Sequence, residues 1–246
     1  MDRMVYVAMT GAREAMHGLA VNANNLANVT TPGFRADLAQ ARSMPVFGPG
    51  HPTRAYAMTE RPGHDLNPST IHTTGRPLDV AIGGAGWLGV LDAQGNEAYT
   101  RRGDFQTTVN GILVNGAGQP VLGNGGPIAL PPAQAVEIAG DGTISILPMG
   151  QNANALVTVD RLKLVNPPGA EMEKGEDGLF RRRDGVPAEA DAAVQVVSGG
   201  LETSNVSAVA AMTEMMTLAR NFEFQIKVME TAKETSERAA TILRLS

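Results

Sequence analysis

The sequence predicts an α+β fold, in which long N- and C-terminal helices pair as a coiled-coil-like domain and a mainly antiparallel β domain lies between them in the chain. Apolar residues recur every three or four positions at both ends of the 246-residue chain, which is the spacing of an amphipathic helix. Short apolar runs fill the middle, and turn-forming dipeptides separate them, as in antiparallel sheets.

An N-terminal helix is expected within residues 1–31. Its a and d positions are apolar except for one asparagine, and several are alanine, so a partner helix could approach closely. These positions are Val5, Ala8, Ala12, Ala15, Leu19, Asn22, Leu26 and Val29. Because Pro32 disfavours the α region for the residue before it, we expect the helix to end between Ala27 and Thr30.

Residues 32–75 are expected to form an extended arm. Proline is frequent in this segment, and it interrupts regular secondary structure. The prolines that indicate the arm are Pro45, Pro49, Pro52, Pro62 and Pro68. Such an arm would connect the first helix to the β domain.

The central β domain is expected to span residues 76–200. Its strand-like runs are 78–82, 112–114, 136–138, 144–146, 157–159, 162–164 and 194–197. Asn-Gly and Asp-Gly pairs separate many of these runs, and each pair suits a tight turn that needs a positive φ at glycine. The glycines of these pairs are Gly111, Gly116, Gly125, Gly142, Gly178 and Gly185.

A second, longer helix is expected within residues 201–246, with Ser204 or Asn205 as its cap. Its a and d positions are Met212, Met215, Ala219, Phe222, Ile226, Met229, Lys233, Ser236, Ala240 and Leu243. A helix of about 40 residues is about 60 Å long, whereas a compact globule of this size is roughly 46 Å across. The helix should therefore project, and its apolar seam needs a partner helix.

Composition excludes several classes of function. The chain has 20 Lys+Arg and 25 Asp+Glu, a net charge of −5, which argues against nucleic acid or an anionic membrane as the main partner. It contains no cysteine, so disulfides and thiolate metal sites are absent. No apolar run approaches the ~20 residues that span a membrane. The N-terminus lacks the basic and apolar regions of a secretion signal, so composition alone would place the protein in the cytoplasm.

Four local patterns that can carry chemistry have simpler structural interpretations. The G-x-G-x-x-G run from Gly84 to Gly89 matches a dinucleotide-binding motif, but a strand and a turn follow it where a helix is required. The histidines show no metal-ligand spacing, so we expect no metal and no cofactor; they are His17, His51, His64 and His72. The basic run 181–183 is typical of a strand edge or a protein contact. Turn positions explain Asp104, Asp141, Asp177 and Asp184, although a catalytic carboxylate pair stays open.

At three places the chain resembles the flagellar axial proteins of bacteria, the rod, hook and hook-associated subunits. Segments 23–28 and 31–35 are similar to their N-terminal signature, segments 74–82 and 99–101 to their core signature, and segments 200–206 and 220–223 to their C-terminal signature. The motif residues are Asn24, Asn25, Leu26, Asn28, Pro32, Gly33, Phe34, Leu78, Asp79, Glu202, Ser204 and Asn205. Within the family, segments 86–88, 161–167 and 177–181 resemble the proximal-rod branch.

This resemblance implies a structural, non-enzymatic subunit of the basal-body proximal rod, which assembles through its terminal helices into the torque-transmitting shaft. The implied partners are copies of itself, other proximal-rod subunits, the distal-rod protein and the flagellar type III export apparatus. Delivery by that apparatus would place the chain in the periplasm without a cleaved signal peptide. The assembly interface is expected at the a and d positions named above from Val5 to Leu26 and from Met212 to Leu243, which fold fully only on assembly.

Three alternatives stay open. The chain could be a related distal-rod or hook-type subunit of the same family. It could be an enzyme acting on cell-wall sugar with carboxylates such as Asp104 or Asp141 in the β domain. It could also bind a membrane surface, although the mixed charges on the flanks of the C-terminal helix argue against this.

Overall fold

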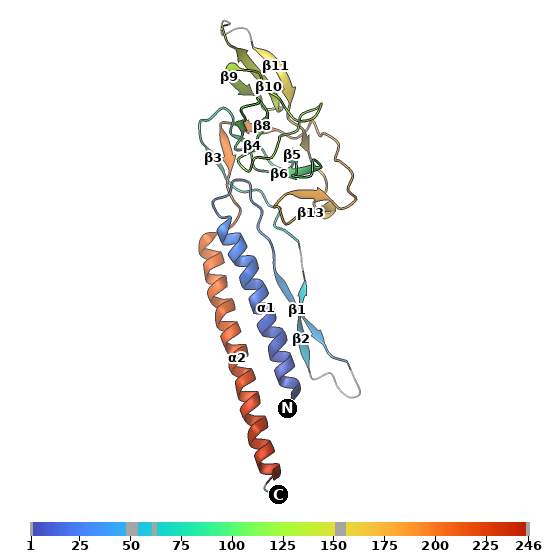
Figure 1. The fold of residues 1–246 in the computed structure, drawn as a ribbon, viewed down its shortest axis with the longest axis vertical. Coiled ribbons are helices and arrows are strands. Elements are labelled where there is room, and N and C mark those ends of the chain that lie inside the picture. Colours follow the sequence, from blue (N-terminus) through green and yellow to red (C-terminus); the bar gives the residue numbers. More distant parts are fainter. Residues whose placement is uncertain (1, 48–53, 61–62, 151–155, 245–246) are drawn as a thin grey trace. The chain divides into compact units, whose positions relative to one another are not determined.

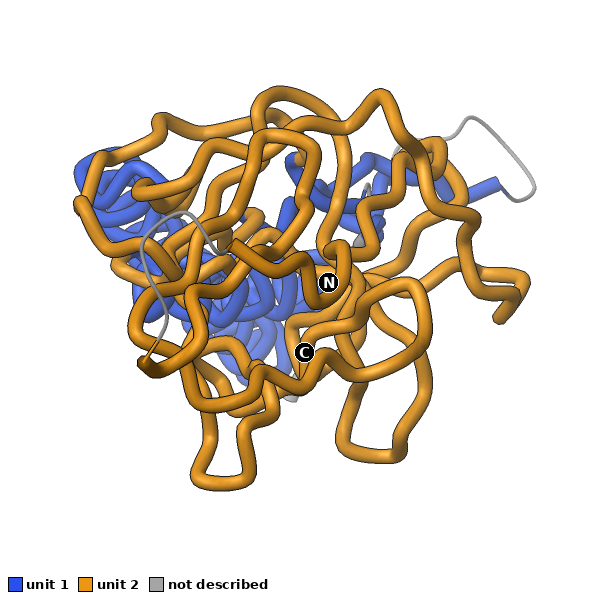
Figure 2. The backbone as a smooth tube through the Cα atoms, turned by 90° about the horizontal axis from the view of Figure 1, so that it is seen from above, with its two compact units in different colours: residues 1–29, 36–65, 206–246 blue, residues 30–35, 66–205 orange. Residues whose placement is uncertain are grey.

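The computed structural model describes residues 2–47, 54–60, 63–150 and 156–244, and the chain folds into two compact units. Unit 1 comprises residues 1–29, 36–65 and 206–246, and unit 2 comprises residues 30–35 and 66–205 (Figure 2). The chain therefore crosses between the units four times. The α+β class predicted from the sequence is confirmed, because unit 1 holds both long helices and unit 2 is built of antiparallel strands.

Unit 1 is organised around α1 (Asp2–Ala27) and α2 (Ala208–Arg244), which lie side by side (Figure 1). Gly11 faces Gln225 and Gly18 faces Leu218, so seven residues forward on α1 correspond to seven residues back on α2. The helices are thus antiparallel. α1 ends at Ala27, where the backbone N–H and the side-chain amide of Asn28 both bond to the Asn24 carbonyl.

The start of α2 differs from the sequence expectation. Ser207 caps it, since its carbonyl accepts the N–H of Ala211 and its hydroxyl lies 3.4 Å from the N–H of Ala210. Neither Ser204 nor Asn205 takes this role. Residues 200–202 form a strand, and the chain stays bonded to unit 2 as far as Asn205, because the Thr203 N–H donates to the Thr70 carbonyl and the Asn205 N–H donates to the Phe34 carbonyl.

Part of the expected arm is also ordered as a ribbon in unit 1. β1 (Gln40–Pro45) pairs antiparallel with β2 (Ala55–Glu60), and β2 contacts α1. Pro45 is the last residue of its strand, where a missing N–H costs least. The structure places residues 36–65 with the helices and residues 66–75 with the β unit, whereas Pro49, Pro52 and Pro62 lie outside the described residues.

Unit 2 contains five antiparallel arrangements. The largest sheet has the order β12-β5-β6-β14-β13, formed by β5 (Trp87–Leu91), β6 (Glu97–Thr100), β12 (Leu164–Val165), β13 (Met172–Lys174) and β14 (Phe180–Arg182). A second sheet has the order β11-β10-β9, formed by β9 (Ala133–Ile138), β10 (Thr143–Pro148) and β11 (Val157–Arg161). The strand pairs are β3 (Ile71–Thr73) with β16 (Gly200–Glu202), β4 (Val80–Ile82) with β15 (Val196–Ser198), and β7 (Gln106–Thr107) with β8 (Leu113–Val114). A short 3₁₀ helix, Gly169–Glu171, precedes β13.

The core of unit 2 is aliphatic. Inward-facing Val, Ile and Leu side chains from β4, β5, β8, β10 and β15 form one buried cluster with Phe105. Three aromatic residues, Trp87, Tyr99 and Phe180, form a second cluster, in which the ring centroids of Trp87 and Phe180 lie 4.4 Å apart. Burial raises the pKa of Tyr99 to about 12, and its hydroxyl donates to Glu97 and accepts the N–H of Ala188.

Most, but not all, of the predicted turns form where expected. Gly111, Gly142, Gly178 and Gly185 have positive φ. In the Asn115-Gly116 turn the positive φ falls instead on Gly118, because the Asn115 side chain accepts the N–H groups of residues 117 and 119 and delays the reversal. In the Asn124-Gly125 turn it falls on Gly126.

Candidate assembly surface and motif cluster

The seam between α1 and α2 is built from small residues on the α1 side. Ala8, Ala12 and Ala15 are buried there, as the alanine spacing predicted. A Cβ added to Gly18 would lie 3.0 Å from Leu218 Cδ1, and one added to Gly11 would lie 3.0 Å from the Gln225 side chain. A methyl group at either glycine would therefore have to displace the end of the facing Leu218 or Gln225 side chain.

The predicted α1 positions Val5, Leu19, Asn22, Leu26 and Val29 are all half-buried. On α2 only part of the predicted set shares this environment. The half-buried members are Met215, Ala219, Phe222 and Met229.

The α2 seam that faces α1 is shifted from the predicted one. Gln225 occupies it next to Gly11, whereas Ile226, the apolar choice, is exposed. Met212 is also exposed, Lys233, Ser236 and Ala240 lie on exposed surface, and the side chain of Leu243 lies outside the described residues. Gly11 leaves room for the polar side chain of Gln225 between the helices. The apolar pattern of α2 alone therefore does not identify every residue that faces α1.

Exposed apolar side chains follow both helices outside this seam. On α2, Val209, Met212 and Met216 are 76%, 53% and 58% exposed. On α1, Met9 and Met16, seven residues apart, are 52% and 58% exposed. Residues this large are rarely placed in helical register on a surface that stays in water.

The N-terminal motif is held by a bidentate amide contact in unit 1. Asn25 is buried, its Nδ2 donates to the Asp37 carbonyl at 2.9 Å, and its Oδ1 accepts the Asp37 N–H at 2.9 Å. The Asp37 carboxylate in turn lies 2.8 Å from Nδ1 of His64. Asn25 thus fixes the chain as it enters the β1–β2 ribbon.

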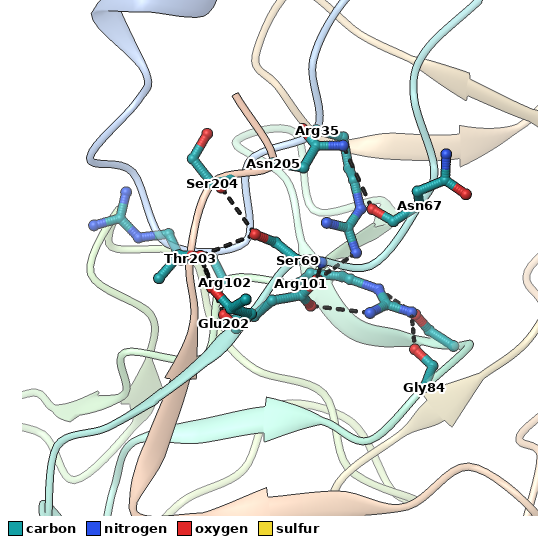
Figure 3. Close-up of polar contacts among 12 residues, drawn as sticks. Arg35, Asn67, Ser69, Gly84, Arg101, Arg102, Glu202, Thr203, Ser204 and Asn205 are labelled. Atoms are coloured by element: carbon teal, nitrogen blue, oxygen red, sulfur yellow. Dashed lines mark hydrogen bonds and ion pairs between the residues drawn. The ribbon is translucent and has the colours of Figure 1, made fainter. Parts of the chain in front are cut away.

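Motif residues from three distant parts of the chain meet in unit 2 around Glu202 (Figure 3). The Glu202 side chain is 1% exposed. Its Oε1 accepts Arg35 Nη2 and the Ser69 N–H, each at 2.7 Å, and its Oε2 accepts Arg101 Nη1 at 2.9 Å. We call Arg35, Ser69, Arg101 and Glu202 the motif cluster.

Gly33 lies beside this cluster and needs its missing side chain. Its φ is +66°, and a Cβ there would overlap the backbone carbonyl of Arg101. Its N–H donates to the Glu202 carbonyl at 2.8 Å. The motif glycine is therefore fixed both by its conformation and by the close approach of another chain segment.

The motif residues Phe34, Ser204 and Asn205 support the same region of unit 2. The Phe34 carbonyl accepts the Asn205 N–H, and the Lys174 ammonium lies 4.0 Å from the Phe34 ring centroid. The Ser69 hydroxyl donates to the Ser204 carbonyl. Asn24 and Leu26 lie in the last turn of α1, and Asn28 and Pro32 lie in the turns that follow it.

Leu78 and Asp79 lie directly before β4. The buried Asp79 carboxylate accepts the Thr74 hydroxyl at 2.6 Å, and its carbonyl accepts the Gly199 N–H. Leu78 packs against the aliphatic core. These contacts give both residues a role in folding.

Arg35 and Arg101 hold the Glu202 carboxylate, but neither is among the motif residues predicted from the sequence. Each is the only charged residue of its quoted segment, 31–35 or 99–101, and this is the signal that marks them. Arg101 also donates to the carbonyls of Gly84 and Gly86. The glycine run weighed as a dinucleotide motif is thus a strand connection that exposes its carbonyls to an arginine.

The acidic and basic side chains considered for other functions have partners within unit 2. Asp104 is paired with Arg102 at 2.8 Å, and Asp141 accepts the Thr143 hydroxyl and N–H. In the basic run, Arg181 bonds to Asp92 and Asp177. Arg182 bonds to Glu171 and Asp184.

No group of three or more His, Asp or Glu side chains that could hold a metal occurs among the described residues. His51 lies outside them. Over the same residues, neither helix is long and apolar enough to cross a membrane.

Arg181 makes unit 2 sensitive to acid. Its hydrogen bonds are the main reason why the pKa values of Asp92 and Asp177 lie below the ordinary value; burial opposes this shift, and backbone N–H donors add to it. The contribution of these two carboxylates to the free energy of unfolding is therefore complete above about pH 5. It is lost as the pH falls below about 3.9, the pKa of an aspartate in the unfolded chain.

We expect the thermal stability of the Asp92→Asn variant to fall less than that of the parent chain between pH 6 and pH 3, measured by circular dichroism. Arg181→Gln should flatten the dependence further, and an unchanged slope in both variants would contradict this account.

Comparisons with known proteins match the C-terminal motif and part of the core motif. The family model described as "Flagellar basal body rod FlgEFG protein C-terminal" matches residues 197–242, and the one described as "Flagellar hook protein FlgE/F/G D1 domain" matches residues 81–146. The chain is 45% identical to the flagellar basal-body rod protein FlgF of Escherichia coli (strain K12) and 44% identical to that of Salmonella typhimurium, over 100% of this chain and of each relative. It is 31% identical to the flagellar basal-body rod protein FlgG of Bacillus subtilis (strain 168), over 99% of this chain and 100% of the relative.

Proposed function

Because this chain belongs to the family of flagellar basal-body rod proteins and is a structural subunit of that rod, we propose that it builds the proximal rod by packing its paired terminal helices against copies of itself and neighbouring rod proteins. The higher identity to FlgF than to FlgG supports the proximal over the distal position. The proposal includes delivery to the periplasm through the flagellar type III export apparatus without a cleaved signal peptide.

The observation that carries this proposal is the exposed apolar surface on α1 and α2. In a lone chain, Met9, Met16, Val209, Met212 and Met216 face water. Covering them in an assembly would remove that apolar area from water, at about 25 cal/mol per Å². Many copies joined by such contacts make a rigid shaft, because two different surfaces of one subunit meet in a head-to-tail contact that continues helically.

The proposal gives the chain no catalytic role. Its support is that the carboxylates considered for catalysis are engaged in ordinary structural contacts, such as the Asp104–Arg102 pair and the Asp141–Thr143 turn.

The double variant Met212→Glu/Met216→Glu tests the assembly surface. We expect it to fold with unchanged helix content, because both side chains are exposed, but to be absent from basal bodies and to leave cells non-motile. The matched control is Thr213→Glu/Thr217→Glu, which has the same spacing on an exposed neighbouring face of α2. Each variant is expressed in cells that lack their own copy, and basal bodies are isolated and probed for it. Normal incorporation of the methionine variant would refute the proposed surface.

A further inference from the structure

α1 has a side that nothing in the described chain covers. The helix packs against α2 and also contacts β2. The remaining side carries seven exposed residues spaced alternately three and four apart, and only one of them is charged. We call them the α1 stripe; they are Tyr6, Met9, Arg13, Met16, Ala20, Ala23 and Ala27.

α2 carries a second series with the same alternating spacing, next to its seam with α1. Six of its seven members are exposed and Ala219 is half-buried, so the series is continuous with the established helix–helix interface. We call it the α2 stripe; it consists of Val209, Met212, Met216, Ala219, Glu223, Ile226 and Glu230. Although Lys227 lies one turn away, the described residues provide no ion pair for Glu223.

The register of the pairing within the chain offers a way to compare the two stripes. In the antiparallel seam, Gly11 faces Gln225 and Gly18 faces Leu218, so the numbers of facing residues total 236. We align the two stripes so that the residue numbers of each facing pair total 236 or 235. This alignment gives seven pairs: Ala27–Val209, Ala23–Met212, Ala20–Met216, Met16–Ala219, Arg13–Glu223, Met9–Ile226 and Tyr6–Glu230.

These pairs are complementary in size and in charge. Four of them place an alanine opposite a larger apolar side chain, which lets facing helices interdigitate. The only cation of the α1 stripe, Arg13, falls opposite Glu223. Among the residues that the structure describes, Arg13 has only a long contact of 3.7 Å to Glu14, and 72% of its side chain is exposed. The phenol of Tyr6 falls opposite the carboxylate of Glu230, to which it can donate.

We propose that the α1 stripe of one copy packs antiparallel on the α2 stripe of a second copy at nearly the same axial level, with an Arg13–Glu223 ion pair that fixes the register. This inference rests on the proposed rod function and specifies its lateral contact. Each copy offers one stripe of each kind, so the contact joins unlike surfaces and propagates from copy to copy. A single charge pair within an apolar helical interface is a known means of setting register.

Charge reversal tests the pairing. Arg13→Glu and Glu223→Arg should each reduce the amount of the chain in isolated basal bodies by about tenfold or more, since each sets like charges against each other. The double reversal should restore most of the incorporation. If both single variants assemble normally, or if the double variant assembles no better than either, the proposed register is wrong.

Cross-linking tests whether the two stripes meet between copies. The chain has no cysteine, so an Arg13→Cys copy co-expressed with a Glu223→Cys copy can form a mixed disulfide of this chain only where two copies touch. We expect the disulfide-linked dimer in oxidised basal bodies, and not with the control pair Arg13→Cys and Thr217→Cys. Chains present in basal bodies but never cross-linked would overturn the stripe pairing while leaving the rod function intact. Chains absent from wild-type basal bodies would overturn the rod function itself.

Discussion

Replacing Glu202 by alanine should lower the free energy of unfolding of unit 2 by about 3–5 kcal/mol, because it would leave the buried guanidinium groups of Arg35 and Arg101 without their shared carboxylate. The Ser69 N–H would also lose its acceptor. Thermal or denaturant unfolding followed by tryptophan fluorescence measures the loss, since Trp87 lies in the same unit.

The matched control for this experiment is Glu171→Ala. Glu171 also forms an ion pair with an arginine, Arg182, but its side chain is half exposed, so its removal should cost less than about 1 kcal/mol. If the two variants are equally stable, the motif cluster does not hold unit 2 together. An intermediate variant, Glu202→Gln, keeps the size of the side chain and isolates the contribution of its charge.

Gly33→Ala should destabilise unit 2 by about 2–5 kcal/mol. Part of this cost, about 1–2 kcal/mol, comes from forcing an L residue into a positive φ. The remainder comes from overlap of the new methyl group with the Arg101 carbonyl, which the arginine side chain holds in place through Glu202. Urea unfolding of the purified chain measures the sum.

Gly178→Ala separates the two causes. Gly178 has a similar φ of +78°, but no heavy atom lies within 4 Å of the position of its Cβ. This variant should therefore show the conformational cost alone. Equal losses at the two glycines would mean that the backbone next to Gly33 adjusts freely, contrary to the close packing around the motif cluster.

Features of the helical unit could be predicted from the sequence where they depend on residues close together in the chain. Helix periodicity is recorded in neighbouring residues, and both helices were found where the apolar spacing placed them, with α1 ending at Ala27. The seam on α2 was displaced because a glycine on the opposite helix, Gly11, admits Gln225 and leaves Ile226 exposed. Nothing within α2 itself encodes that choice.

The motif cluster shows the same division. The resemblance identified Gly33 and Glu202 as family residues, but not what they do. Glu202 bonds to Arg35, which lies 167 positions earlier in the chain, and to Arg101, which lies 101 positions earlier. Single-sequence patterns extend over a few turns of helix or strand, so they cannot report such contacts.

The amino-acid sequence was sufficient to predict the class of fold, the two helices, the antiparallel character of the central region and the family to which the chain belongs. These follow from periodicity, turn chemistry and motifs, which act between neighbours in the chain. The three-dimensional structure was needed to find that β1 and β2 form a ribbon whose second strand contacts α1, that α2 begins at Ala208, and which helix faces are exposed. These depend on packing and hydrogen bonding between segments distant in sequence, where the fit of one surface is set by another.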